Sequence, residues 1–190
     1  MAEFLSSMVM DHEKWHDGIG YDVHLIDAMT DEQKSAIESK LIAKGVSDWR
    51  DLEALDRLGT PGATAAILAT RKSKDRELRV RAQSYGPPPS DEDREAAILA
   101  GLQSDAGRSK AIDAAANCPT PKIIKGLVEC LTKTVGADAY SVVATLFFMH
   151  GKMDSPHSMA HRQFFLRFVE PGPDKDAAMA ELRQKFKLPS

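Results

Sequence analysis

The residues with the most specific chemical pattern form the segment His12-Glu13-Lys14-Trp15-His16. It matches the H-E-x-x-H motif, in which two histidines one helical turn apart bind zinc and the glutamate activates a water molecule. Asp22 lies six residues after His16, where the extended motif carries a third ligand, but that motif needs glycine where this chain has Ile19. Two histidines in a last helical turn also act as donors or cations at a helix C-terminus. We favour this second interpretation over a zinc hydrolase.

Two other sets of side chains could form binding sites. The six histidines fall into an early and a late group, namely His12, His16 and His24, and His150, His157 and His161. A basic run covers residues 71–81, and Lys72, Arg76 and Arg79 in it would share one helical face. We expect packed or solvated histidines and a solvated basic face, with a nucleic-acid or acidic protein partner as the alternative for the run. The net charge of −3 gives no overall attraction to nucleic acid or anionic membranes.

The remaining sequence lacks the motifs of the common enzyme classes. It has no glycine-rich phosphate loop, no nucleophile elbow and no redox pair of cysteines. Cys118 and Cys130 are expected to be buried thiols in a reducing compartment. The N-terminus lacks a basic region followed by an apolar one, and the longest apolar run, 142–149, is too short for a membrane span. We therefore expect a cytoplasmic, non-enzymatic protein without metal or cofactor.

Composition and the spacing of glycine and proline predict an all-α protein. Hydrophobic residues make up 43% and charged residues 28%, as in globular proteins, and alanine is abundant. No stretch alternates apolar and polar residues, whereas Gly and Pro recur at intervals suited to short helices. We expect helices over 3–16, 30–44, 48–58, 61–72, 74–84, 90–103, 108–116, 120–133, 137–150, 158–168 and 175–186. Thr30 with Gln33 has the spacing of a capping box, and Asp48 and Ser90 are expected N-caps.

An internal repeat indicates how these helices are arranged. The word Ala-Ala-Ile-Leu occurs at 65–68 and again at 96–99. The two copies begin 31 residues apart. Paired helices that recur with a period of this length are typical of an α-solenoid. We predict a short right-handed α-solenoid as one domain over 1–190, with a helical bundle as the alternative. Residues 1–47 would form an N-terminal cap, 48–155 the repeats and 156–190 a C-terminal cap.

Three stretches carry a family resemblance. They are Trp15-His16-Asp17-Gly18-Ile19-Gly20-Tyr21-Asp22, then Val46-Ser47-Asp48-Trp49-Arg50-Asp51-Leu52, and Phe147-Phe148-Met149-His150-Gly151-Lys152. In this order they resemble small bacterial HEAT-like (armadillo-type) repeat proteins. Some proteins of this type are similar to immunity proteins, which neutralise toxins of polymorphic or type VI secretion systems. The resemblance implies a protein-binding module whose partner is a cognate toxin; the alternative is a general scaffold or regulator.

The expected contacts with that partner follow from side-chain type and position. Large aromatics in or beside turns are candidate anchors, although turn aromatics also pin a cap onto the first repeat. Acidic residues nearby would suit a partner with a basic groove. At the N-terminal end we predict contacts from Trp15, His16, Asp17, Tyr21, Asp22, Trp49 and Asp51. A second candidate edge consists of His150, Asp154 and His157.

Overall fold

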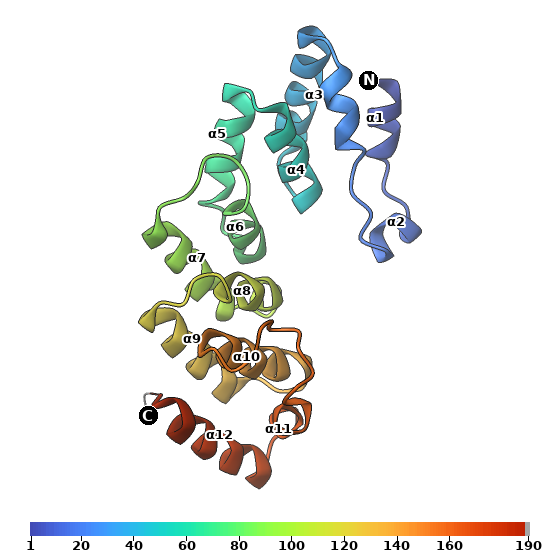
Figure 1. Ribbon diagram of the computed structural model, residues 1–190. Coiled ribbons are helices and arrows are strands. Elements are labelled where there is room, and N and C mark those ends of the chain that lie inside the picture. The colour runs from blue at the N-terminus through green and yellow to red at the C-terminus, as the bar shows by residue number, and fades with distance from the viewer. Residues whose placement is uncertain (189–190) are drawn as a thin grey trace. The chain divides into compact units, whose positions relative to one another are not determined.

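The computed structural model describes residues 1–188, and within them the chain forms twelve α-helices, one 3-10 helix and no strand (Figure 1). The predicted all-α class is confirmed. By its internal contacts the chain divides into two compact units, Met1–Pro89 and the segment from Ser90 onward. The division into caps and repeats stays a prediction. Within the described residues, every helix is too short or too polar to cross a membrane.

The first unit begins with an irregular N-terminal segment and continues as packed helices. Its elements are α1 (Ala2–Ser7), α2 (His12–His16), η1 (Val23–Ala28), α3 (Asp31–Lys44), α4 (Trp49–Leu58), α5 (Pro61–Thr70) and α6 (Arg76–Ala82). Helix α3 packs against α4 and α5, α4 packs against α5 and α6, and α5 packs against α6. The prediction of one helix over 3–16 is wrong. Helix α1 ends at Ser7, and Asp11 starts α2 by accepting a hydrogen bond from the Lys14 amide. Figure 1 shows α2 at the far end of the loop that connects α1 to η1.

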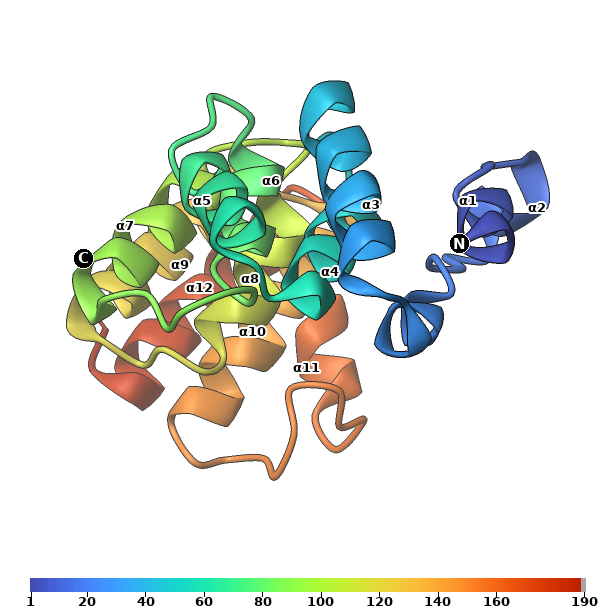
Figure 2. The same ribbon diagram turned by 90° about the horizontal axis from the view of Figure 1, so that it is seen from above.

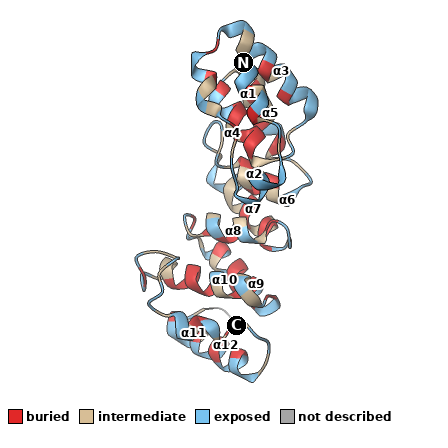
Figure 3. Cartoon of the chain, turned by 90° about the vertical axis from the view of Figure 1, so that its right-hand side faces the viewer, coloured by how far each residue is buried: buried red, intermediate tan, exposed pale blue. Residues whose placement is uncertain are grey.

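The second unit also consists of packed helices. Its helices are α7 (Asp91–Leu102), α8 (Arg108–Ala115), α9 (Pro121–Lys133), α10 (Gly136–Met149), α11 (Arg162–Leu166) and α12 (Pro173–Phe186). Helix α7 packs against α8 and α9, and α10 packs against α8, α9 and α11. Figure 1 shows α9 and α10 as a layer next to α7 and α8, and in Figure 2, seen from above, the two layers overlap. Half of the residues of helix α10 are buried, without interruption from Val142 to Phe147 (Figure 3). This helix therefore forms the centre of the core of the unit.

Helix starts recur every 30 residues. Helices α3, α5, α7 and α9 begin at residues 31, 61, 91 and 121. Each follows a hydroxyl N-cap whose side chain accepts a hydrogen bond from the amide three residues on: Thr30, Thr60, Ser90 and Thr120. Four pairs of residues 30 positions apart are hydrogen-bonded in the described chain: Tyr21–Asp51, Asp27–Arg57, Asp56–Gly86 and Arg108–Asp138. Neighbouring helix pairs within a unit thus place equivalent positions side by side.

The core of the first unit is aliphatic apart from Phe4 and Tyr21, whereas the core at the end of the second unit is aromatic. Phe147 packs edge-on against Phe165 and Phe186, with ring centroids 5.0 Å and 4.9 Å away. Cys118 and Cys130 are free and buried, as predicted, and burial raises the pKa of both thiols. Both therefore serve as small apolar side chains of this core.

One cation is buried in the second unit. Lys175, near the start of α12, is 7% exposed, and its ammonium group donates a 2.5 Å hydrogen bond to the Thr134 carbonyl between α9 and α10. Burial lowers its pKa. The charged form thus opposes folding, because a buried ammonium loses its hydration.

This burial makes the stability of the protein depend on pH in a defined direction. Because the pKa of Lys175 is lowered in the folded state, the folded chain releases this proton at a pH where the unfolded chain still holds it. Relative to Lys175→Met, the wild type should gain unfolding free energy as the pH rises from about 7 toward the ordinary lysine pKa of about 10.4, by at most about 1.4 kcal/mol per pH unit. Urea unfolding of both proteins over this range measures the difference. A difference that stays constant with pH would contradict the prediction.

Candidate functional site

The candidate site depends on Arg50, which lies in the first turn of α4 and is 3% exposed. Its Nε donates a 2.6 Å hydrogen bond to the Ile19 carbonyl, and Nη2 donates at 3.4 Å to the Lys14 carbonyl. Nη1 pairs with Asp48 at 2.8 Å, and the guanidinium lies 4.8 Å from the ring of Trp49. One buried side chain therefore fastens α2 and the segment after it to the start of α4.

The next residue, Asp51, is fully buried and fastens the same region a second time. Its Oδ1 accepts hydrogen bonds from the Tyr21 hydroxyl at 3.0 Å and from Lys44 Nζ at 2.7 Å. Its Oδ2 accepts from the amide and the hydroxyl of Ser47. Burial and the nearby Asp51 raise the pKa of Tyr21. Burial opposes the charge of Lys44, but its hydrogen bonds to Asp51 and Tyr21 leave its pKa above the ordinary value. The carboxylate is thus fully satisfied inside the unit.

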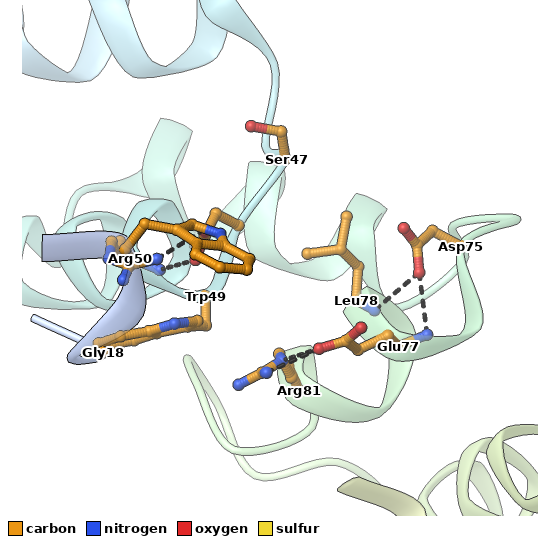
Figure 4. Close-up of a pocket in the computed structure, with 10 residues that line it drawn as sticks. Gly18, Ser47, Trp49, Arg50, Asp75, Glu77, Leu78 and Arg81 are labelled. Carbon is orange, nitrogen blue, oxygen red and sulfur yellow. Dashed lines mark hydrogen bonds and ion pairs between the residues drawn. The ribbon is translucent and has the colours of Figure 1, made fainter. Parts of the chain in front are cut away.

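A cleft of about 400 Å³ opens beside Arg50. Its lining comes from three places in the first unit: Trp15 and Gly18 at α2, Ser47 to Arg50 at the start of α4, and Asp75, Glu77, Leu78 and Arg81 at α6. Figure 4 shows Trp49 and Arg50 on one side, facing Leu78, Glu77 and Arg81 on the other. Trp15 is 66% exposed, and Trp49 is half-buried. The cleft therefore combines two indole rings with charged groups.

The charged groups of the α6 side are held in place by short-range bonds. Asp75 caps the helix, because its Oδ1 accepts from the amides of Glu77 and Leu78 at 2.9 Å and 3.1 Å. Arg81 donates through Nε and Nη2 to Glu77 Oε1 at 2.8 Å and 2.6 Å, one helical turn away. These side chains are therefore ordered before any ligand arrives.

Several of the predicted contact residues gather at this end of the unit. Trp15 and Trp49 line the same cleft although 34 positions separate them in the sequence. His16 and Asp17 are exposed next to it, with His16 Nδ1 and Asp17 Oδ1 3.0 Å apart. Asp22 is exposed and lines a smaller groove, of about 260 Å³.

Tyr21 and Asp51 need a correction. Both were predicted to contact a partner, but their side chains are buried and bonded to each other. Their role is to hold the N-terminal segment against α3 and α4.

The second predicted edge lies in the second unit. His150 stacks on Phe186 with ring centroids 4.4 Å apart and an interplanar angle of 3°, and burial, together with Lys152, lowers its pKa. This histidine is therefore mainly a packing residue. Asp154 and His157 are exposed, and His157 lines a groove of about 500 Å³ with Phe148.

The cleft also contains residues that the sequence did not single out. Asp75, Glu77 and Arg81 belong to the stretch interpreted as a solvated basic face. The sequence signal at Asp75 and Glu77 was only that of a helix start, because aspartate is a preferred N-cap and acidic residues are favoured in the first turn. The basic run itself is largely engaged inside the unit: Arg79, for example, donates through Nε and Nη2 to the Ser73 carbonyl at 3.0 Å and 2.6 Å.

The H-E-x-x-H segment does not assemble a metal site. His12 and His16 lie on exposed positions of α2 with their rings 6.1 Å apart. Among residues 1–188, no group of three or more His, Cys, Asp or Glu side chains is placed to hold a metal ion. The arrangement therefore offers no support for the zinc-hydrolase alternative.

Comparisons of the chain with protein-family models, with curated proteins and with solved structures find no match. A function must accordingly be inferred from the geometry of the cleft and from the residues that build it.

The role of Arg50 can be tested against a matched arginine on the same helix. Arg50→Met keeps the apolar stem and removes the bonds to Ile19 and Lys14. We expect a loss of about 2–3 kcal/mol of unfolding free energy, since several charge-assisted hydrogen bonds are lost, and faster amide exchange over residues 14–19. Arg57→Met removes an exposed pair with Asp27 and should change little. Denaturant unfolding and hydrogen-exchange mass spectrometry measure both effects. Equal behaviour of the two variants would contradict the assignment.

Proposed function

We propose that the protein is a non-enzymatic protein-binding module that uses Trp15 and the adjacent cleft as its contact surface. The observation that carries this proposal is the state of Trp15: the side chain is 66% exposed, while the backbone around it is fastened by Arg50. Exposed large aromatics on ordered segments are typical binding hot spots, because they bury much apolar area at little entropic cost. Together with Trp49 and Arg81, the cleft has the residue types enriched in hot spots.

We further infer that both units consist of HEAT-like repeats of one α-solenoid. The support is the packing of alternate helices within each unit, namely α3 with α5, α4 with α6, α7 with α9 and α8 with α10, and the 30-residue spacing of capped helix starts. In a solenoid each repeat contacts its neighbours, so equivalent positions recur at the repeat length. The hydrogen-bonded pairs 30 positions apart fit this arrangement.

Solution scattering tests the solenoid. A compact domain of 190 residues has a radius of gyration of about 16 Å. A continuous solenoid is longer than it is wide, so we expect the monomer to exceed this value and to give an asymmetric distance distribution. Small-angle X-ray scattering behind a sizing column measures both. A symmetric distribution at about 16 Å would favour the helical bundle.

The proposed partner is a cognate bacterial toxin, so that the protein acts as an immunity protein. The resemblance to HEAT-like immunity proteins supports this choice, as does a preordered surface that covers another protein without needing to fold on it. In this mechanism the solenoid blocks the active site of the toxin or the path of its substrate. A general scaffold or regulator is the alternative.

Growth rescue tests the proposal. The candidate toxin is a protein that is encoded beside this gene and is toxic when expressed alone. Co-expression with the wild type should restore growth and yield a stoichiometric complex. Trp15→Ala should weaken that complex at least tenfold, since truncation of a hot-spot tryptophan costs about 2 kcal/mol or more.

Met159→Ala is the matched control for this experiment. Met159 is 62% exposed and lies in the other unit, so its truncation should leave the affinity unchanged. Isothermal titration calorimetry compares the three proteins after circular dichroism has shown equal helicity. A toxin that is not bound, or is bound equally well by Trp15→Ala, would rule out the proposed surface.

A further inference from the structure

The second unit contains a groove that is separate from Trp15 and its cleft. We propose that this groove, of about 500 Å³ between α8 and α10, binds a small neutral ligand with several hydroxyl groups, of the size of a monosaccharide. Thr145 is the central hydrogen-bonding group of the site. The inference goes beyond the proposed function and does not depend on it, because the lining residues of the groove all belong to the second unit.

Two packed helices and one loop build the groove. Helices α8 and α10 contact each other, and the axes of packed helices lie about 8–10 Å apart, so one small molecule can reach side chains of both. Asp113 lies on α8, and Asn117 lies in the turn that follows it. Ser141 and Thr145 lie one turn apart on α10. The loop after α10 adds His157. The groove therefore collects five polar side chains from three places.

The Thr145 hydroxyl is the feature that points to a ligand. The residue is 2% exposed, yet within residues 1–188 its hydroxyl forms no hydrogen bond. Thr70, a buried threonine of the first unit, instead donates to the Ala66 carbonyl at 2.9 Å. Thr145 is also not among the unbonded side-chain atoms of the described chain that are fully enclosed. Its hydroxyl therefore opens into the groove, where a ligand can supply the missing partner.

The other polar side chains of the groove are open to a ligand as well. In the part of the chain that the structure describes, the side chains of Asn117, Ser141 and His157 form no hydrogen bond. Each of them can both donate and accept, as a hydroxyl group of a ligand can. Asp113 is exposed and lies 3.5 Å from Lys110. The site is therefore rich in neutral donors and acceptors.

An apolar surface completes the groove. The ring of Phe148 is half-buried and, unlike that of its neighbour Phe147, forms no ring pair within the described residues. A ligand in the groove can therefore pack on this ring. The apolar lining residues are Ile112, Ala116, Phe148 and Pro156.

These features select the class of ligand. An anion is disfavoured, because the lining found among residues 1–188 includes Asp113 but neither Lys nor Arg. A wholly apolar ligand would leave Thr145 and the other polar groups unbonded, which opposes binding. A sugar ring has an apolar face and a rim of hydroxyl groups, so it satisfies both kinds of lining. The volume of the groove lies in the range of small-molecule sites, about 300–1,000 Å³.

The test titrates the full-length, ¹⁵N-labelled protein with glucose, galactose and mannose. At least one sugar should cause saturable shifts of the amide signals of residues 112–117, 141–148 and 156–157. The uronic acid of that sugar, which has the same ring but a negative charge, should bind at least threefold more weakly, because Asp113 repels it. N-acetyl-glycyl-glycine amide, a neutral peptide, is the competing ligand and should bind more weakly than the sugar.

Thr145→Val is the decisive variant, because valine has the shape of threonine without the hydroxyl. We expect its affinity for the sugar to fall about three- to tenfold, as for the loss of one hydrogen bond. The Thr145 hydroxyl has no bond to lose inside the described chain, so the urea midpoint should not decrease. Thr70→Val is the matched control. It removes a bonded hydroxyl from the first unit, so it should lower the urea midpoint and leave the sugar affinity unchanged.

The inference is overturned if none of the three sugars shifts the signals of the groove, or if Thr145→Val binds like the wild type. It is also overturned if the uronic acid binds as tightly as its sugar, or if the peptide binds the groove more tightly than the sugars do. These outcomes are separate from those for the proposed function. The sugar titration needs no toxin, and growth rescue that depends on Trp15 needs no sugar.

Discussion

The buried guanidinium of Arg50 is the constraint on which the N-terminal half of the cleft depends. Helix α2 has five residues and none of them is buried, so neither propensity nor apolar packing can hold it. Its attachment comes from the hydrogen bonds of Arg50 to the carbonyls of Lys14 and Ile19. The neighbouring Asp51 network adds a second attachment through Tyr21. Trp15 can be exposed while its backbone stays ordered only because polar bonds take the place of a hydrophobic core here.

A regular arrangement of caps supports this irregular segment. Four helices begin 30 residues apart behind a threonine or serine, and each cap satisfies an amide that the helix itself leaves unpaired. Because the spacing is equal, neighbouring helix pairs have the same length and register. Residues that are 30 positions apart in the sequence therefore contact each other. Asp56 and the Gly86 amide illustrate this, as do Arg108 and Asp138. The site is thus an addition at one place on a periodic framework.

Features that depend on neighbours in sequence could be predicted, whereas those that depend on distant contacts could not. The caps Thr30, Asp48 and Ser90 were predicted because capping involves residues two or three positions apart. The shared word at 65–68 and 96–99 marked equivalent helices, with Ile67 and Ile98 buried in both. The partner of Asp51 was not predictable, since Tyr21 lies 30 residues away. For the same reason the buried carboxylate of Asp51 was predicted to lie at the surface, and Asp75 was not predicted to line the cleft.

The way in which Arg50 holds α2 has an evolutionary consequence. Its hydrogen bonds go to main-chain carbonyls, which every amino acid possesses, so the attachment is indifferent to the side chains at positions 14 and 19. Mutations within residues 12–18 can therefore replace the exposed surface without loosening its anchorage, as long as the short helix still forms. A surface segment held in this way tolerates exchange of its side chains while the framework that holds it stays the same. A gene family built on this plan could change its recognition specificity rapidly while the genes kept a common architecture.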